Sequence, residues 1–167
     1  MATTSESRVI AAPVADVWAS ITNLEEAARW NQSWQRVEYL SGWREGVGAT
    51  FRAYNEDGIG HNFRISEWTP LKLIAFTPLR DEPEEGRYLI TLESQGFILR
   101  PEGDDHTDVS LFATAAGHGL RGWFTARFLW PGYQRQGLGR ALDALQALFE
   151  PSSDEDEPDH EQPEHGD

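Results

Sequence analysis

The chain has no cysteine among its 167 residues. A disulfide framework, a thiolate metal site and a thiol nucleophile are therefore excluded as explanations of its fold or chemistry. It also lacks an apolar run long enough for a signal peptide or a membrane span. Because neither a signal peptide nor a membrane span is expected, we expect a cytoplasmic protein, while the absence of cysteine leaves the redox compartment undetermined.

Basic residues are scarce, with 14 Lys and Arg against 28 Asp and Glu, a formal net charge of −14. A nucleic-acid-binding protein must neutralise phosphates with Lys and Arg, so nucleic acid is not expected as a partner. The same acidity disfavours contact with an anionic membrane. Membrane contact is therefore the less favoured alternative at this point.

The acidity is concentrated in the last 18 residues, 150–167, which hold nine carboxylates and no Lys or Arg. This segment has almost nothing apolar to bury and repels itself, so we predict a disordered acidic tail. Residues 1–149 then form one domain, long enough to enclose a single core. The histidines are spread without the spacing of metal ligands, so no metal site is expected.

The periodicity of apolar residues changes twice along the domain. A short β-prone run at 7–12 precedes two short helices, the first with apolar residues at Val14, Val17, Trp18 and Ile21. From Val37 the period is two, and after Gly119 the helical period returns up to Phe149, with Pro131 expected to kink the helix. The runs of period two are residues 36–42, 48–58, 61–70, 71–79, 87–103 and 106–117. The order predicts an α+β fold in which a curved antiparallel sheet of about seven strands surrounds a long C-terminal helix.

Several stretches resemble one known family, among them "VIAAPVADVWASITNLEEAARWN", "VGATFRAYNEDG", "ISEWTPLKLIAF", "FILRPEGDDHTDVSL" and "ALDALQALFE". Together with intervening pieces they span residues 8–150, and they resemble the SRPBCC (START-like, helix-grip) superfamily in its polyketide cyclase/dehydrase-type branch. The resemblance implies a helix-grip fold with a cavity between the sheet and the last helix. It implies little about chemistry, because the superfamily includes carriers, receptors and enzymes.

Strand alternation indicates which residues face that cavity. If the turn around "NEDG" has two or four residues, Arg52 and Tyr54 lie on the same face as His61. A three-residue turn would place Phe51 inward instead. The expected apolar lining from the strands is Phe63, Ile65, Phe97, Leu99, Val109, Leu111 and Ala113. We expect Trp18 and Trp30 to pack as core and lid of the cavity.

The first half of the last helix adds Phe124 and Phe128 to the expected lining, from a stripe that starts at Leu120. Arg127 interrupts this stripe. Two interpretations stay open: Arg127 holds an anionic group of the ligand, or it is structural and reaches solvent or a carboxylate such as Glu93.

The sequence predicts a protein that binds a small apolar, aromatic or lipid-like molecule without a cofactor. One alternative is a cofactor-independent cyclase or dehydratase on the same pocket, with His61 and Tyr54 as candidate catalytic residues. A second is an interaction module that docks a protein or a membrane, suggested by the aromatic stretch "GWFTARFLWPGY". Neither ligand identity nor oligomeric state follows from the sequence.

Overall fold

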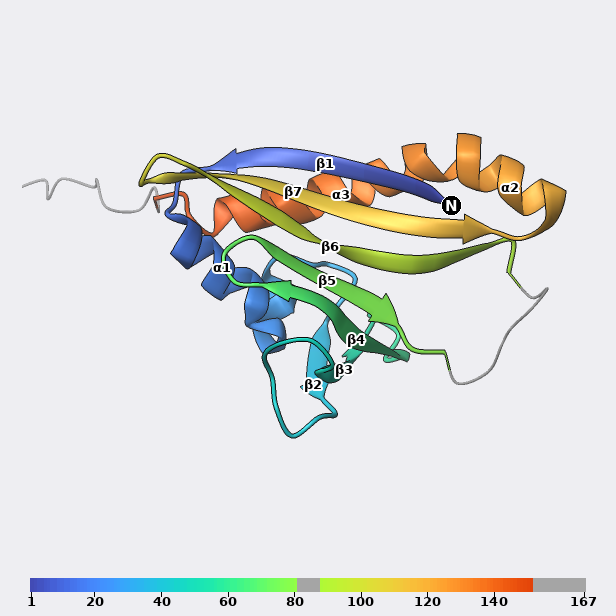
Figure 1. Cartoon of the computed structure of the whole chain (residues 1–167), viewed down its shortest axis with the longest axis horizontal. Coiled ribbons are helices and arrows are strands. Elements are labelled where there is room, and N and C mark those ends of the chain that lie inside the picture. The colour runs from blue at the N-terminus through green and yellow to red at the C-terminus, as the bar shows by residue number, and fades with distance from the viewer. Residues whose placement is uncertain (81–87, 152–167) are drawn as a thin grey trace, which may run out of the picture.

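The computed structural model describes residues 1–80 and 88–151. It confirms the predicted α+β helix-grip architecture, one curved antiparallel sheet whose concave face holds the helices (Figure 1). The predicted acidic tail lies, from residue 152 on, outside the described residues. The elements in chain order are β1 (Ala2–Ile10), α1 (Val14–Thr22), the 3-10 helix η1 (Leu24–Arg29), β2 (Arg36–Tyr39), β3 (Thr50–Tyr54), β4 (Gly60–Thr69), β5 (Leu73–Pro78), β6 (Ile90–Glu102), β7 (His106–Gly117), α2 (Gly119–Phe128) and α3 (Trp130–Ala147).

The seven strands follow the order β1-β7-β6-β5-β4-β3-β2, and every neighbouring pair is antiparallel. Strands β2 to β7 form a meander, and β1 returns to pair with β7 along its whole length, from Ala2 opposite Ala115 to Ile10 opposite Thr107. Irregularities in register at Ile65/Glu67 and at Leu92/Ser94 add local twist. The sheet therefore curves around the helices rather than lying flat.

Helix α3 supplies the apolar stripe that the sheet grips. Leu138, Leu142 and Leu145 are buried, at offsets of four and seven residues that share one helix face. They join one core with Val17 and Ile21 of α1. This is the packing that the helical period in the second half of residues 120–149 predicts.

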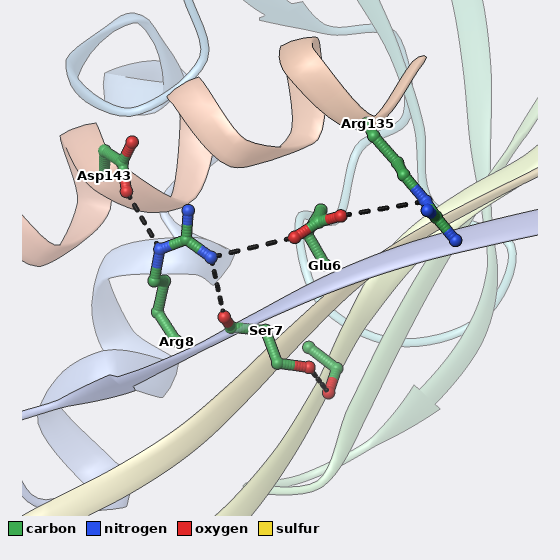
Figure 2. A network of polar contacts seen from close by, with 6 residues as sticks. Glu6, Ser7, Arg8, Arg135 and Asp143 are labelled. Carbon is green, nitrogen blue, oxygen red and sulfur yellow. Dashed lines mark hydrogen bonds and ion pairs between the residues drawn. The ribbon is translucent and has the colours of Figure 1, made fainter. Parts of the chain in front are cut away.

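Charged side chains hold α3 along β1 at the surface (Figure 2). Arg8 Nε donates to Asp143 Oδ1 at 3.0 Å, and the Arg8 guanidinium also lies 3.7 Å from Glu6. Glu6 in turn lies 3.8 Å from Arg135, which precedes Asp143 on α3. Because these groups are partly solvated, each pair contributes little stability, but the network fixes how α3 lies along the strand.

The predicted kink is a break between two helices. Helix α2 ends at Phe128 and α3 begins at Trp130, so Pro131 lies in the first turn of α3, where its missing N–H leaves no hydrogen bond unmade. Leu129 is the only residue between the two helices. The break lets α2 take its own direction at one end of the molecule (Figure 1).

Candidate functional site

A pocket of about 200 Å³ lies between the inner face of β5, β6 and β7, the segment after η1, and the first half of α3. It is the space that a helix-grip fold leaves between its sheet and its last helix. Its lining residues are Trp30, Asn31, Ser33, Trp34, Phe76, Gln95, Gly96, Phe97, Leu111, Tyr133, Gln134, Gly137, Leu138, Arg140 and Ala141.

Aromatic rings form one wall of the pocket. Trp30 packs edge-on against Phe97, with ring centroids 5.1 Å apart, and Trp34 lies 5.8 Å from Phe76. The indole N–H of Trp30 donates to the Ser20 carbonyl at 3.3 Å, which ties the ring to the end of α1. All four rings are almost fully buried. The wall is therefore preorganised and presents aromatic faces and edges to anything that enters.

Two glycines shape the pocket from opposite sides. At Gly96 on β6, an added Cβ would lie 2.2 Å from the Ile74 carbonyl oxygen, so β5 and β6 approach more closely there than any side chain allows. At Gly137 on α3, an added Cβ would meet nothing within 4 Å. Gly137 thus leaves open space on the helix side of the pocket, while Gly96 allows the close approach of β5 and β6 on the sheet side.

The polar groups of the pocket are amides, hydroxyls and one guanidinium. Gln95 reaches in from the sheet, opposite the buried Ala113, and Asn31 accepts a hydrogen bond from the Ser33 N–H at 3.0 Å. Arg140 is exposed and donates to the Gln136 carbonyl at 3.3 Å. Among the described residues that line the pocket there is no Asp, Glu, His, Lys or Cys. The pocket can therefore orient a polar group, but its own side chains offer no carboxylate or imidazole to take a proton.

The shifted pKa values that the structure shows lie elsewhere. Burial, and secondarily the charge of Glu25, raises the pKa of Tyr39 above its usual value. A hydrogen bond with His106, at 2.9 Å, lowers the pKa of the exposed Asp105 in the turn before β7. Neither residue lines the pocket. Residues 1–80 and 88–151 contain no cluster of three His, Asp or Glu side chains that could hold a metal ion.

The amino-acid sequence assigns the chain to one family. The sequence matches the family described as "Polyketide cyclase / dehydrase and lipid transport" over residues 1–150. The chain belongs to this family. The match covers every described strand and helix, so the expected SRPBCC resemblance is confirmed at the level of the family. No curated protein matches the sequence.

Solved structures share the fold of this polyketide cyclase/dehydrase family member at low sequence identity. The Zhui aromatase/cyclase from Streptomyces sp. R1128 is 18% identical with a TM-score of 0.64, over 88% of this chain and 92% of that one. A putative uncharacterized protein from Bacillus thuringiensis is 14% identical with a TM-score of 0.67, over 89% and 98%. The di-domain ARO/CYC protein BexL from the BE-7585A biosynthetic pathway is 14% identical with a TM-score of 0.70, over 90% of this chain and 48% of that one. At these identities the likeness concerns the fold alone.

The predicted inner-face residues of this family member divide into two groups. Phe97 and Leu111 line the pocket. The other predicted strand positions are buried in the core without lining it, because the helices and the aromatic wall cover them; they are Phe63, Ile65, Leu99, Val109 and Ala113. Alternation therefore locates the inner face, but it does not tell which part of that face stays uncovered.

The predicted placement of Arg52 and Tyr54 on the inner face is wrong. The turn has five residues, 55–59. The Asn55 N–H donates to the Ile59 carbonyl oxygen at 3.0 Å, and the Ile59 N–H donates to the Asn55 side-chain oxygen at 2.8 Å. An odd turn reverses the alternation of β3, so Phe51 and Ala53 point inward. Tyr54 instead donates to Glu38 at 3.0 Å on the outer face. His61 is exposed near the strand end, so neither proposed catalytic side chain lies in the pocket.

The predicted placement of Phe124, Arg127 and Phe128 toward the cavity is also wrong. All three are exposed, and α2 contacts the sheet through Gly122 and Ala126 on its opposite side. A Cβ on Gly122 would lie 2.3 Å from the Leu89 carbonyl oxygen, so the backbones touch and leave no room for large side chains. The alternative partner of Arg127, Glu93, instead pairs with Arg80 at 3.1 Å.

Sequence reasoning missed most of the pocket's helix side. Tyr133, Gly137 and Ala141 line it at four-residue spacing, which puts them on one face of α3. That spacing is visible in the sequence, but a face with a glycine and a tyrosine does not stand out beside the leucine stripe. Trp34 lies in a segment without periodicity, so no pattern assigns it to the site.

Proposed function

We propose that the protein binds a small aromatic or otherwise apolar molecule that carries one or two polar substituents. The observation that carries the proposal is the buried aromatic wall of Trp30, Trp34, Phe76 and Phe97 facing an open pocket. Pockets that bind small molecules are typically lined by apolar and aromatic side chains with a few polar groups that orient the ligand. This pocket combines such an aromatic wall with a larger share of polar groups than is typical.

The size of the pocket limits the ligand. Its volume of about 200 Å³ slightly exceeds an apolar cavity of about 150 Å³ that takes up benzene. It lies below the range of roughly 300–1,000 Å³ that is common for drug-sized ligands. One or two fused rings fit inside, and any further part of the ligand extends past the exposed Tyr133 and Arg140.

The polar groups suggest how such a ligand is oriented. Gln95, on the inner face of the sheet, can hydrogen-bond a carbonyl or hydroxyl group that enters the pocket. Arg140, at the solvent side, can hold a carboxylate or phenolate through charge-assisted hydrogen bonds. The ligand would thus enter with its ring first and keep its charged group outside.

A cyclase or dehydratase activity on the same pocket is the second candidate. It is supported by the family description and by the fold shared with the Zhui aromatase/cyclase. Such a reaction needs a group that polarises a carbonyl, for which Arg140 and Tyr133 are available, and a group that moves a proton. Because the described pocket residues include no carboxylate or imidazole, binding is favoured over catalysis.

The experiment uses 2-naphthol as probe and tryptophan fluorescence as readout. We expect saturable quenching with one site per chain, because Trp30 and Trp34 form the wall. Gly137→Leu fills the open space on the helix side and should weaken binding at least about tenfold. Gly132→Leu is the matched control, since a Cβ there also meets nothing within 4 Å but the residue does not line the pocket.

Equal binding by wild type and Gly137→Leu would contradict the proposed site, and absence of saturable quenching would contradict the ligand class. Native mass spectrometry of the purified protein then identifies any small molecule that copurifies. If an incubated aromatic polyketide-type compound is released with a changed mass, catalysis replaces simple binding as the function.

A further inference from the structure

Helix α2 presents an apolar surface that no other described part of the chain covers. It consists of Leu120, Trp123, Phe124 and Phe128, which are 84%, 55%, 55% and 60% exposed. The rings touch one another: Phe124 and Phe128 have centroids 4.7 Å apart, and Trp123 and Phe128 6.4 Å. We refer to these four residues as the α2 surface. Helix α2, which carries them, lies at one end of the molecule (Figure 1).

The geometry of α2 keeps this surface outward. Successive helical residues are about 100° apart, which puts Phe124 roughly opposite the buried Gly122 and Ala126. A Cβ on Gly117 at the end of β7 would lie 2.2 Å from the Gly122 carbonyl oxygen, so the small-residue side is held against the sheet by backbone contact. Rotating α2 to bury its rings would require the two backbones to separate.

The segment of sequence that contains α2 carries a charge opposite to that of the rest of the chain. The sequence contains no Asp or Glu from Val109 to Leu142, although the whole chain has 28. Arg121 and Arg127 flank the rings and are exposed, and neither pairs with a carboxylate within residues 1–80 and 88–151. The surface therefore combines aromatic rings with guanidinium groups that pair with no carboxylate of residues 1–80 and 88–151.

We propose that the α2 surface docks the protein on an anionic phospholipid bilayer. Trp and Phe favour the boundary between headgroups and acyl chains, and adjacent arginines bind lipid phosphates. The net charge of −14 by itself predicts repulsion from an anionic bilayer. However, charges further away than about 10 Å are largely screened at physiological salt. Local charge therefore decides which face approaches the membrane. None of the described helices is long and apolar enough to cross a membrane, so contact is at the surface.

A second copy of the chain fits this surface less well. Two copies related by a two-fold axis would place the same patch against itself, because such an interface is self-complementary. Arg121 and Arg127 of both copies would then lie in one interface, to which residues 109–142 contribute no carboxylate. A bilayer of anionic lipids supplies the missing negative charge together with an apolar layer.

The α2 surface continues toward the pocket. Leu129 and Tyr133, 64% and 80% exposed, follow Phe128 across the helix break, and Tyr133 lines the pocket. A docked bilayer would thus lie near the solvent side of the pocket. The docking proposal does not depend on what the pocket binds.

The test is flotation of the full chain with vesicles of equal parts phosphatidylcholine and phosphatidylglycerol. We expect wild type to float with these vesicles and not with pure phosphatidylcholine, and to be released by high salt. Trp123→Ser with Phe128→Ser should weaken binding at least about tenfold. Arg127→Glu changes the local charge by two units and should weaken binding by roughly 25-fold, at about fivefold for each unit of charge.

Matched controls distinguish binding through the α2 surface from nonspecific binding to vesicles. Trp43→Ser removes a ring of equal exposure, 56%, far along the chain from α2, and Arg64→Glu makes the same charge change on the outer face of β4. Both should bind as wild type does. Failure of wild type to float, or equal weakening by control and α2 variants, would overturn the proposal. So would a wild-type dimer in analytical ultracentrifugation that the α2 variants dissociate.

Discussion

Two groups of aromatic rings in this protein have similar contacts and opposite environments. Trp34 lies 5.2 Å from Phe63 in the core, and Phe124 lies 4.7 Å from Phe128 on the outside of α2. The difference is in the backbone spacing beneath them. The segment after η1 stands off the sheet and leaves a layer for rings, whereas α2 touches the sheet through glycine. Aromatic pairs therefore indicate a core only where backbones are far enough apart.

The comparison also separates two kinds of contribution. Rings buried between layers stabilise the fold, because unfolding would expose their whole apolar surface. Rings that water already reaches gain little from folding, so the α2 surface is available for an interaction between molecules. The following four variants test this division, from the largest expected effect to the smallest.

Trp34→Ala should cost the most, about 3 to 5 kcal/mol of unfolding free energy. Trp34 is 7% exposed and its ring packs against Phe51, Phe63 and Phe76, so removing it leaves a large cavity. Urea unfolding followed by circular dichroism measures the change. A loss below about 1 kcal/mol would mean that the aromatic wall is not the centre of stability.

Gly96→Ala should destabilise the protein by about 1 to 3 kcal/mol, the range for overpacking. The added Cβ would lie 2.2 Å from the Ile74 carbonyl oxygen and 2.7 Å from the Ala75 Cα, and both belong to a central strand that cannot move away cheaply. Chemical denaturation measures the effect. If the variant is as stable as wild type, β5 and β6 are further apart than described.

Gly122→Ala makes a comparable clash, 2.3 Å from the Leu89 carbonyl oxygen, with a smaller global effect of less than about 1 kcal/mol. Alanine favours the helical conformation over glycine by up to about 1 kcal/mol. In addition, α2 can move off the sheet because the helix is interrupted at Leu129. Hydrogen exchange should speed up within α2 and stay unchanged in α3. Equal loss of protection in both helices would show that they unfold as one unit.

Trp123→Ser combined with Phe128→Ser should change the unfolding free energy by no more than about 0.5 kcal/mol for each residue. Both rings are already more than half exposed. The thermal midpoint measures this. A drop comparable to that of Trp34→Ala would show that a part of the chain covers the α2 surface.

Local patterns predicted the elements and the inner face well. Alternation along β7 follows from the rule that successive side chains point to opposite sides, and Val109, Leu111 and Ala113 are buried as it requires. The leucines of α3 follow the same logic with the helical period. These features depend only on neighbours along the chain, which a sequence displays.

The errors arose where one local choice controls distant geometry. The turn at 55–59 has one residue more than an even turn, which reversed the predicted faces of Arg52 and Tyr54. On α2, the apolar stripe satisfied every criterion for a buried face, but Gly117 and Gly122 let backbones meet on the other side. Turn length and backbone contact between distant segments are tertiary facts, so periodicity alone cannot supply them.

The pairing of the first strand with the last has a consequence for synthesis of the protein. Ile10 and Thr107 pair across 97 positions, and Ala2 and Ala115 across 113. At a translation rate of about 5 to 20 residues per second, β1 leaves the ribosome roughly 5 to 20 seconds before its partner exists. An unpaired apolar strand would aggregate during that time. Between Thr3 and Arg8, β1 has only Thr, Ser, Glu and Arg side chains. These polar side chains keep the unpaired strand solvated until β7 has been synthesised.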